Sequence, residues 1–352
     1  MTTDKQDPAL RTALVIGATG GLGAEVARQL LAQGWQVRAL TRHADMAARV
    51  AADGSALSQL RGVDWRLGDA LSADDVYKAA RGVRFIIHAA NPPRYSRWRE
   101  LALPMLSHAI EAARAHGARL ILPGNVYNFG PDAGHCVSED ALQRPLTRKG
   151  AVRVEMEQML HEAAHDPHRP VRSLVLRAGD FFGGHAPASW FQTLMVKPGK
   201  PLKQVTYPGE PEVGHAWAYL PDLAATMARL MDMDLADAQR LATCEVLHCG
   251  GHWMARGVAM AEAVRRASGV PNLPIKTMPW GLLMMLTPFV RVLREMQEMR
   301  YLWQVPLQLD NRKLVALLGH EPHTHLDEAV RQSLVELGCL QTDAQAARLA
   351  TR

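Results

Sequence analysis

The stretch TALVIGATGGLGAEVARQLLAQG, residues 12–34, decides the fold. Residues 12–18 are mostly apolar, which predicts a buried strand. Gly17, Gly20 and Gly23 follow with the spacing G-x-x-G-x-x-G, and the residues after them have the apolar periodicity of a helix. A glycine-rich turn between a strand and a helix lets the backbone approach a pyrophosphate and points the helix N-terminus at it. An ordinary glycine-rich turn is the alternative, but the strand before it and the helix after it favour a dinucleotide site.

Strands and helices alternate along the first half of the chain. Such alternation implies βαβ units, and therefore a doubly wound parallel Rossmann sheet of the α/β class with helices on both faces. We expect further strands at 35–42, 63–69, 83–90, 118–124 and 171–179. Helices are expected directly after the first strand, from about residue 43, at 72–82, in a segment ending near 116, and at 149–165.

The regular alternation of strands and helices ends at about residue 180, where glycine, proline and aromatic residues become frequent. We therefore expect an NAD(P)-binding Rossmann domain at 1–180, with later strands near 213–250 returning to it. Residues 181–352 would form a smaller, mostly helical, substrate-binding cap and the C-terminal helices. The later helices are expected at 221–232, 255–268, 291–300 and 325–337.

The bulk composition excludes several classes of protein. The chain has 352 residues and a formal net charge of +5, but its basic residues form no long run, so we expect no nucleic-acid partner. Four cysteines without a C-x-x-C pair do not suggest a disulfide framework. The N-terminus lacks a leader pattern, and the most apolar stretch, 278–290, holds two prolines and is shorter than the ~20 residues of a spanning helix. We expect a cytoplasmic protein without a membrane span that binds a small anionic ligand.

The end of the second expected strand indicates the cofactor. NAD sites usually place Asp or Glu there for the ribose 2′-hydroxyl, whereas an arginine accommodates the 2′-phosphate of NADP. This chain has Thr41 and Arg42 at that point and no carboxylate. A solvated surface arginine is the alternative interpretation. The missing acid favours NADP, with NAD the less favoured cofactor.

Several segments occur in the order that a known family shows. The layout resembles the extended and atypical short-chain dehydrogenase/reductases, the NAD(P)-dependent epimerase/dehydratase-like proteins. The resemblance implies that Asp69 contacts the adenine and that the segment after the fourth strand lies beside the cofactor. The segments that carry it are GATGGLG (17–23), GDALSADDV (68–76), HAAN (88–91), NVYNFG (125–130), RAGDFFGG (177–184), HAWAYLPDLA (215–224) and LDNRKLVALLGHEPHTHLDEAV (309–330).

The chain departs from this family at the catalytic helix. The family usually carries Y-x-x-x-K, in which the tyrosine transfers a proton and the lysine holds the nicotinamide ribose, and a Ser or Thr ends the fifth strand. Here Lys149 stands at the tyrosine position and Arg153 at the lysine position, with Glu157 at the usual spacing. The serine region reads LPGN, so Asn125 is its nearest side chain that can form hydrogen bonds. The usual triad is absent.

Two explanations of this departure stay open. In one, catalysis is lost and the fold only binds nucleotide. In the other, Lys149 transfers the proton, because K-x-x-x-R-x-x-x-E resembles the helix of the isoflavone reductase and phenylcoumaran benzylic ether reductase group, whose lysine is a general acid/base. Partial burial and the guanidinium of Arg153, on the same helix face, would disfavour the ammonium form, whereas cofactor phosphates would favour it. A further interpretation is that Lys149 is an ordinary solvent-exposed lysine at a helix start. Tyr127 is a second candidate for the proton donor.

The expected function is that of an NADP-dependent oxidoreductase. Hydride would pass between nicotinamide and a carbonyl or activated carbon of a small organic substrate, with Lys149, Tyr127 and Asn125 as catalytic candidates. The alternatives are an NADP-binding sensor or regulator without turnover and a sugar-nucleotide epimerase/dehydratase-like enzyme. A homodimer is compatible with the sequence. The expected cofactor contacts are Gly17, Thr19, Gly20, Gly21, Leu22, Gly23, Thr41, Arg42, Asp69, Ala70, His88, Ala89, Ala90, Lys149 and Arg153.

Two other patterns resemble metal sites. HEAAH, residues 161–165, matches the zinc-protease pattern H-E-x-x-H, but it ends the helix that begins near Lys149, roughly 18 Å along at 1.5 Å per residue. CEVLHC, residues 244–249, alternates as a buried strand does. We therefore predict no metal site. The methionine-rich stretches at 282–288 and 294–303 are either simple core or the wall of an apolar pocket.

Overall fold

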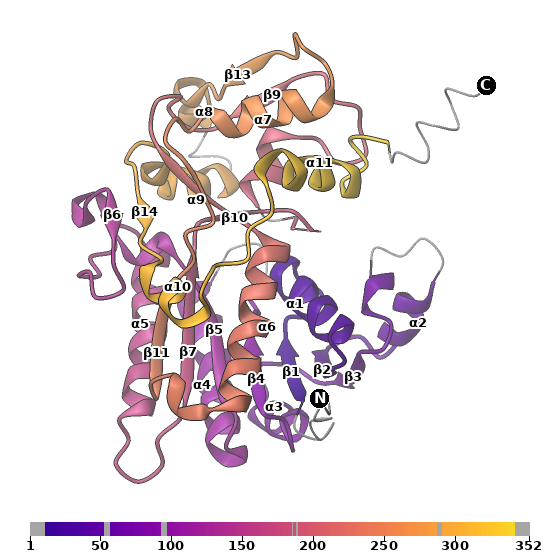
Figure 1. Ribbon diagram of the computed structural model, residues 1–352, viewed down its shortest axis with the longest axis vertical. Coiled ribbons are helices and arrows are strands. Elements are labelled where there is room, and N and C mark those ends of the chain that lie inside the picture. The colour runs from indigo at the N-terminus through magenta and orange to yellow at the C-terminus, as the bar shows by residue number, and fades with distance from the viewer. Residues whose placement is uncertain are drawn as a thin grey trace.

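A seven-stranded sheet forms the centre of the protein (Figure 1). The computed structural model describes residues 11–52, 57–92, 97–184, 186–187, 189–286 and 291–341. The strands lie in the order β11-β7-β5-β4-β1-β2-β3 and every pairing is parallel. Their bounds are β1 Thr12–Ile16, β2 Gln36–Thr41, β3 Asp64–Leu67, β4 Phe85–His88, β5 Arg119–Asn125, β7 Ser173–Ala178 and β11 Cys244–His248.

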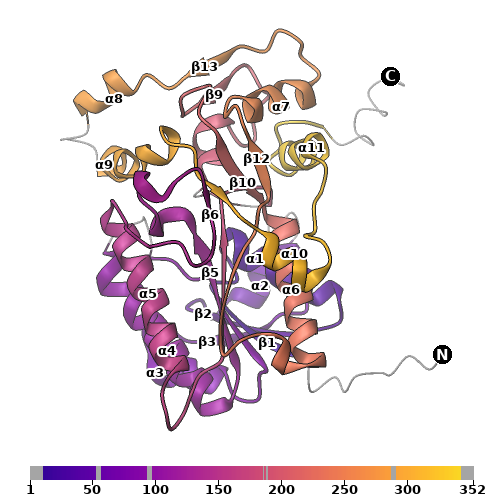
Figure 2. The ribbon, with the colours of Figure 1, turned by 60° about the vertical axis from the view of Figure 1, so that its left-hand side comes forward.

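Helices cover both faces of this sheet, which confirms the doubly wound α/β fold (Figure 2). One face packs against α1 (Gly21–Ala32) and α6 (Leu220–Ala236). The other packs against α3 (Ala73–Ala79), α4 (Trp98–His116) and α5 (Arg148–Ala164). A short helix, α2 (Met46–Ala51), follows β2.

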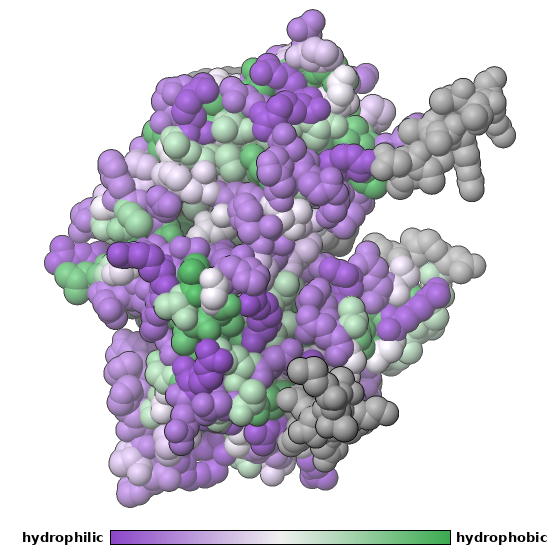
Figure 3. All heavy atoms as spheres, in the orientation of Figure 1, coloured by the Kyte–Doolittle hydropathy of each residue, from purple (hydrophilic) through white to green (hydrophobic). Residues whose placement is uncertain are grey.

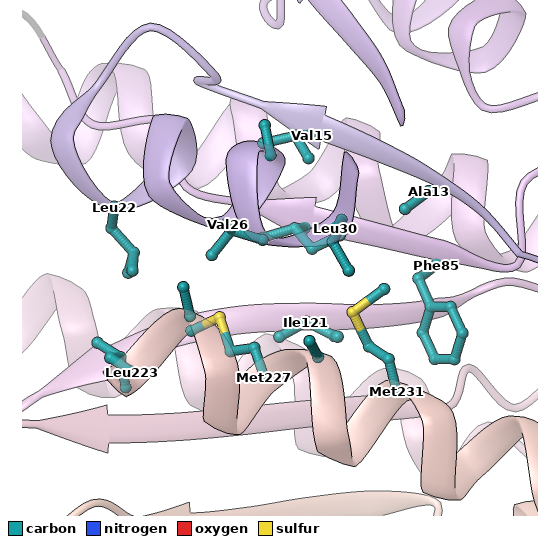
Figure 4. Packing of buried hydrophobic residues seen from close by; sticks show 14 of the residues in the cluster. Ala13, Val15, Leu22, Val26, Leu30, Phe85, Ile121, Leu223, Met227 and Met231 are labelled. Carbon is teal, nitrogen blue, oxygen red and sulfur yellow. The ribbon is translucent and has the colours of Figure 1, made fainter. Parts of the chain in front are cut away.

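The pleat of β1 shows why both faces need cover. Ala13 and Val15 point to the α1–α6 side, whereas Leu14 and Ile16 point to the other, and all four are at most 1% exposed. Burying a side chain of the size of Val, Leu or Ile contributes about 1.5–3 kcal/mol, so the all-apolar pattern of this strand stabilises a central position. Figure 4 shows the α1–α6 side, where one helix presents Leu22, Val26 and Leu30 and the other Leu223, Met227 and Met231.

A smaller part covers the carboxyl edge of the sheet. It holds a three-stranded sheet in the order β12-β10-β8 and two parallel pairs, β9 with β13 and β6 with β14. Its strands are β6 Cys136–Val137, β8 Asp180–Phe182, β9 Val205–Tyr207, β10 His215–Tyr219, β12 His252–Met254, β13 Ile275–Thr277 and β14 Gln308–Leu309. Its α-helices are α7 Ala259–Ser268, α8 Trp280–Leu286, α9 Arg291–Glu298 and α11 Leu326–Glu336. Helix α10, Arg312–Leu318, packs instead on the α1–α6 core of the central sheet through Leu314.

The chain after residue 180 contributes to both parts. Strand β11 pairs with β7 at the edge of the central sheet, and α6 packs into the same core as α1. Strand β10, in contrast, lies in the three-stranded sheet of the smaller part. The two parts are therefore continuous through β11 and α6, and the cleft between them is set by elements from both.

The surface drawn in Figure 3 is mostly hydrophilic, with hydrophobic residues in scattered groups. Among the described residues, no helix combines the length and apolar character needed to cross a bilayer. The apolar stretch 278–290 forms α8 in part, and residues 287–290, with the end of the first methionine-rich stretch, lie outside the described residues.

Candidate active site

The glycine turn joins β1 to α1 as the spacing predicts. Gly17 has φ +91°, a conformation that L side chains rarely adopt. A Cβ there would also lie 2.7 Å from the backbone nitrogen of Ala90, so only glycine lets β1 and β4 approach so closely. Helix α1 then begins at Gly21 with its first N–H groups and the positive end of its dipole at the turn. The local geometry therefore suits an anionic group.

A cavity of about 1160 Å³ opens at this turn, between the carboxyl edge of the sheet and the smaller part. Its volume exceeds that of a usual small-ligand site, which is about 300–1000 Å³. The residues that line it extend from the end of β2 to the start of α5. Its wall includes sixteen of the residues predicted from the sequence. They are Gly17, Thr19, Gly20, Gly21, Leu22, Thr41, Arg42, Asp69, Ala70, His88, Ala89, Ala90, Asn125, Tyr127, Lys149 and Arg153.

One predicted residue, Gly23, does not line this cavity. It lies in the first turn of α1, where a Cβ would sit 2.2 Å from the carbonyl oxygen of Gly17. The third glycine of the motif thus permits the close packing of helix against turn.

The end of β2 carries the features predicted for cofactor choice. Arg42 is exposed and lines the cavity between Thr41 and His43. The Thr41 hydroxyl accepts a hydrogen bond from the His43 backbone (3.2 Å), which fixes this turn. In the neighbouring loop after β3, Asp69 Oδ1 accepts from the Leu71 backbone (3.0 Å), so this carboxylate orders its own loop. The wall at β2 therefore presents a guanidinium where NAD sites present a carboxylate.

The start of α5 brings Lys149 to the opposite end of the cavity. Thr147 caps the helix by accepting from the Gly150 backbone at 3.0 Å. A Cβ at Gly150 would lie 2.3 Å from the carbonyl oxygen of Tyr127, so the glycine lets α5 abut the turn η4 (Val126–Asn128). Lys149 and Tyr127 consequently line the same wall, and the lysine is only 4% exposed.

An acidic partner from the smaller part lies beside this lysine. The Nζ of Lys149 is 3.8 Å from Oε2 of Glu298 at the end of α9, and the Glu298 side chain is 14% exposed. Arg148, the preceding residue, is 85% exposed and reaches the same carboxylate at 3.5 Å. Lys149 is therefore buried on the cavity wall beside an opposite charge. It is not the solvent-exposed lysine of the alternative interpretation.

Asn125 and Arg153 are both held by protein contacts. Oδ1 of Asn125 accepts from the Tyr127 backbone at 3.0 Å and so caps η4. The guanidinium of Arg153 donates to the Pro123 carbonyl (3.1 Å) and to Asn91 Oδ1 (2.9 Å), and it lies 5.2 Å over the ring of Trp98. Arg153 thus ties the ends of β4 and β5 to α5.

His88 ends β4 at the floor of the cavity. It is 2% exposed, and neither ring nitrogen has a hydrogen-bond partner among the described residues. Burial, and then the nearby Arg153 guanidinium, lowers the pKa of His88 to about 4, so the ring is neutral at pH 7. A buried imidazole without a partner is costly, and a bound polar ligand would satisfy it.

Glu157, the third member of the helix pattern, has a structural role. Its carboxylate accepts from the Arg177 guanidinium (2.6 Å to Oε2), and both side chains are buried. Arg177 also contacts His248 Nε2 at 3.0 Å. This network locks α5 to β7 and β11, which fixes the helix that carries Lys149.

An acidic residue that the sequence did not single out also lines the cavity. Asp180, at the start of β8, lies 2.8 Å from Nε2 of His215, whose Nδ1 is 3.2 Å from the Leu302 carbonyl. These two contacts fix the orientation of the His215 ring. The RAGDFFGG segment pointed to this region, but the partner is 35 positions away in sequence.

The apolar part of the wall comes from the smaller part and from α4. Trp190, Met296 and Met299 face the cavity from one side and Trp98 and Met105 from the other. The second methionine-rich stretch therefore contributes to the pocket wall as well as to the core, in which Met299 is 3% exposed.

The HEAAH pattern occupies the far end of α5. The helix ends at Ala164, and His161 and His165 are both exposed, with ring centroids 4.1 Å apart. His165 Nδ1 lies 2.7 Å from the carbonyl of His161, so this nitrogen already serves the helix end. Neither histidine lines the cavity.

Comparison with known proteins agrees with this geometry. Residues 17–157 match the model of a family described as NAD(P)H-binding. The sterol-4-alpha-carboxylate 3-dehydrogenase (decarboxylating) of Bos taurus is 27% identical over 188 residues, which are 51% of this chain and 49% of that protein. The chain thus spans about half the length of the curated relatives it matches.

Solved structures resemble the chain over nearly its full length. The UDP-glucose 4-epimerase of Bifidobacterium longum, in complex with NAD+ and UDP, has a TM-score of 0.68 at 16% identity, covering 95% of this chain and 99% of that one. The UDP-glucose-4-epimerase of Stenotrophomonas maltophila, with bound NAD and formylated UDP-arabinopyranose, has a TM-score of 0.70 at 15% identity, covering 97% and 99%. Residues 17–157 therefore match an NAD(P)H-binding family, and the chain as a whole has the fold of these UDP-glucose 4-epimerases.

Proposed function

We propose that the protein is an NADP-dependent oxidoreductase in which Lys149 replaces the tyrosine of its fold relatives. The observation that carries this proposal is the placement of Lys149, buried on the cavity wall beside Tyr127 and held by Glu298. A lysine that is merely solvated would not be buried with a carboxylate 3.8 Å from its Nζ. The K-x-x-x-R-x-x-x-E resemblance to the isoflavone reductase group supports the same role.

The residues present suit a nicotinamide dinucleotide. Gly17 leaves room that a Cβ would fill, and the N-terminus of α1 offers N–H groups to a pyrophosphate. Arg42 is placed for a ribose 2′-phosphate, and the ring nitrogens of His88 lack partners at the other end. The solved structures of the fold relatives contain NAD, so the proposed preference for NADP rests on Arg42 and the missing acid at β2.

The chain's own residues would carry out the proton transfer. A bound nicotinamide cofactor supplies or accepts the hydride at the substrate carbon. In the reducing direction, Lys149 gives a proton from Nζ to the substrate oxygen, and in the oxidising direction it takes one back. Glu298 keeps the Lys149 amine oriented. Arg153 fixes the ends of β5 and β4 by donating to the Pro123 carbonyl and to Asn91 Oδ1. The aromatic and methionine wall excludes water and favours an organic substrate with an apolar body.

The experiment is NADPH oxidation against a panel of aldehydes, ketones and enones, with purified wild-type protein and two variants. Lys149→Met should reduce turnover by about 10²–10⁴-fold, the usual contribution of a general acid/base. Arg148→Met is the matched control, because it removes the exposed partner of the same Glu298 carboxylate. We expect it to leave turnover within about threefold of wild type, since surface ion pairs contribute little.

The alternative function is that of a nucleotide-binding sensor without turnover. It is supported by the absence of the tyrosine and of a hydroxyl at the end of β5. If NADPH binds but no substrate is reduced, the protein is a nucleotide-binding sensor instead. If a sugar nucleotide is interconverted without net NADPH consumption, the epimerase function of the fold relatives applies. If Lys149→Met keeps full activity, the proton comes from Tyr127 or another donor.

A further inference from the structure

Three side chains that are distant in sequence converge away from the cavity. Asp222 lies in the first turn of α6, His252 begins β12, and His323 lies in the loop before α11. One ligand atom of each, a carboxylate oxygen or a ring nitrogen, lies within 4.8 Å of the other two. None of the three lines the cavity described above.

His252 supplies an independent sign that a ligand belongs here. The residue is 5% exposed, and its Nε2 is buried without a hydrogen-bond partner among the described residues. Leaving a polar atom buried and unpaired costs about 1–3 kcal/mol.

Asp222 is already oriented toward this point. Its Oδ2 accepts from the Thr324 backbone and its Oδ1 from the Thr324 hydroxyl, both at 2.7 Å. Each carboxylate oxygen keeps a further lone pair. Metal-binding carboxylates are typically held by such outer hydrogen bonds, and here the residue that orients Asp222 is the chain neighbour of His323.

We propose that Asp222, His252 and His323 bind one divalent transition-metal ion, for which zinc is the best chemical match. Two imidazoles and a carboxylate are ligands that Zn²⁺ prefers, whereas Mg²⁺ and Ca²⁺ prefer oxygen alone. Tetrahedral Zn²⁺ places its ligand atoms about 3.3 Å apart, so the present spacing has to close slightly. His323 is exposed and is therefore the ligand that moves.

The ion would join three parts of the chain. Helix α6 packs against α1, β12 belongs to the three-stranded sheet, and the loop at His323 leads into α11. A metal at this point links the C-terminal segment to both parts of the fold. Because none of the three ligands lines the cavity, the ion has a structural role. It stabilises the native state by mass action, since the unfolded chain does not hold the three ligands together.

The test is calorimetric titration of metal-depleted full-length protein with ZnCl₂ in a non-coordinating buffer, together with thermal unfolding. We expect one equivalent of zinc to bind and to raise the Tm. His323→Ala, an exposed position that should fold normally, should weaken binding by at least about tenfold and remove the rise in Tm, since loss even of an outer-shell contact costs about 10–100-fold in affinity.

Two further variants sharpen the result. His252→Asn should also lose binding, and His161→Ala, which alters the exposed HEAAH pattern on α5, should keep it. Failure of the wild-type protein to bind stoichiometric zinc would overturn the proposal. Equal zinc affinity in His323→Ala and wild type would overturn it too, as would loss of binding in His161→Ala. Each of these readouts is independent of turnover and of NADP.

Discussion

Two neighbouring residues at the start of α5 show how position decides the role of a charged side chain. Arg148 is 85% exposed and Lys149 is 4% exposed, although both approach Glu298. The sequence identified Lys149 through its spacing to Arg153 and Glu157. It gave no indication of Glu298, because that partner comes from α9, about 150 positions later.

The proposed preference for NADP rests on Arg42. We predict that Arg42→Asp weakens NADPH binding by tenfold or more, because it removes a charge-assisted contact worth roughly 1.5–3 kcal/mol and places a carboxylate near the 2′-phosphate. NADH affinity should stay equal or rise, since Asp is the residue that binds a free 2′-hydroxyl. Calorimetry with both nucleotides measures the two affinities. Equal weakening of NADPH and NADH would show instead that the substitution damages the site as a whole.

The element that carries Lys149 is α5, and Gly150 sets its position. Gly150→Ala should lower the free energy of unfolding by about 1–3 kcal/mol, because its Cβ would collide with the Tyr127 carbonyl and the backbone has to shift. Urea unfolding measures this change. Gly281→Ala is the matched control, since a Cβ there meets nothing within 4 Å and should be neutral or slightly stabilising. A Gly150→Ala variant as stable as wild type would mean that α5 and η4 separate freely.

The regular elements of the nucleotide-binding half were predictable from the sequence. The predicted strand at 12–18 corresponds to β1, Thr12–Ile16, and the predicted helix at 149–165 to α5, Arg148–Ala164. These segments have strong periodicity and clear turn residues, so local preference and tertiary packing agree. Helices α8 and α10 were not predicted. The short strand pairs β6–β14 and β9–β13 were not predicted either, because strands of two or three residues form only where a distant partner pairs with them.

Sites formed by residues that are distant in sequence could not be predicted either, because the sequence shows only local patterns. Local motifs gave the glycine turn, Arg42 and the α5 pattern, and all of these except Gly23 line the cavity or hold its wall. The Asp180–His215 pair and the cluster of Asp222, His252 and His323 join residues that are 30 or more positions apart. HEAAH, a pattern that is visible locally, lies on an exposed helix end instead.

At the scale of the whole molecule, buried histidines, among them His88 and His248, make stability depend on pH. Burial, and then Arg177, lowers the pKa of His248 to about 3, and the pKa of His88 is lowered to about 4. Between these values and about 6.5 the unfolded chain binds protons that the native state does not, so stability is full above pH 6.5 and falls on acidification. Each group should contribute a loss of up to about 2 kcal/mol between pH 6.5 and 5.

Urea unfolding of the ligand-free protein at a series of pH values measures this loss. The exposed His161 is the control, because His161→Ala removes a histidine with little burial and should leave the slope unchanged. A free energy of unfolding that stays constant from pH 6.5 to 5 would contradict the neutral, buried state of both rings.

The structure of the protein with NADP+ bound tests the proposed reductase function most directly. We expect the pyrophosphate at the N-terminus of α1, the 2′-phosphate at Arg42, and Nζ of Lys149 as the side-chain donor nearest to the space in front of nicotinamide C4. A nicotinamide ring that faces Tyr127 or Asp180, with Lys149 still directed at Glu298 and out of reach of C4, would contradict the assignment of Lys149 as the proton donor.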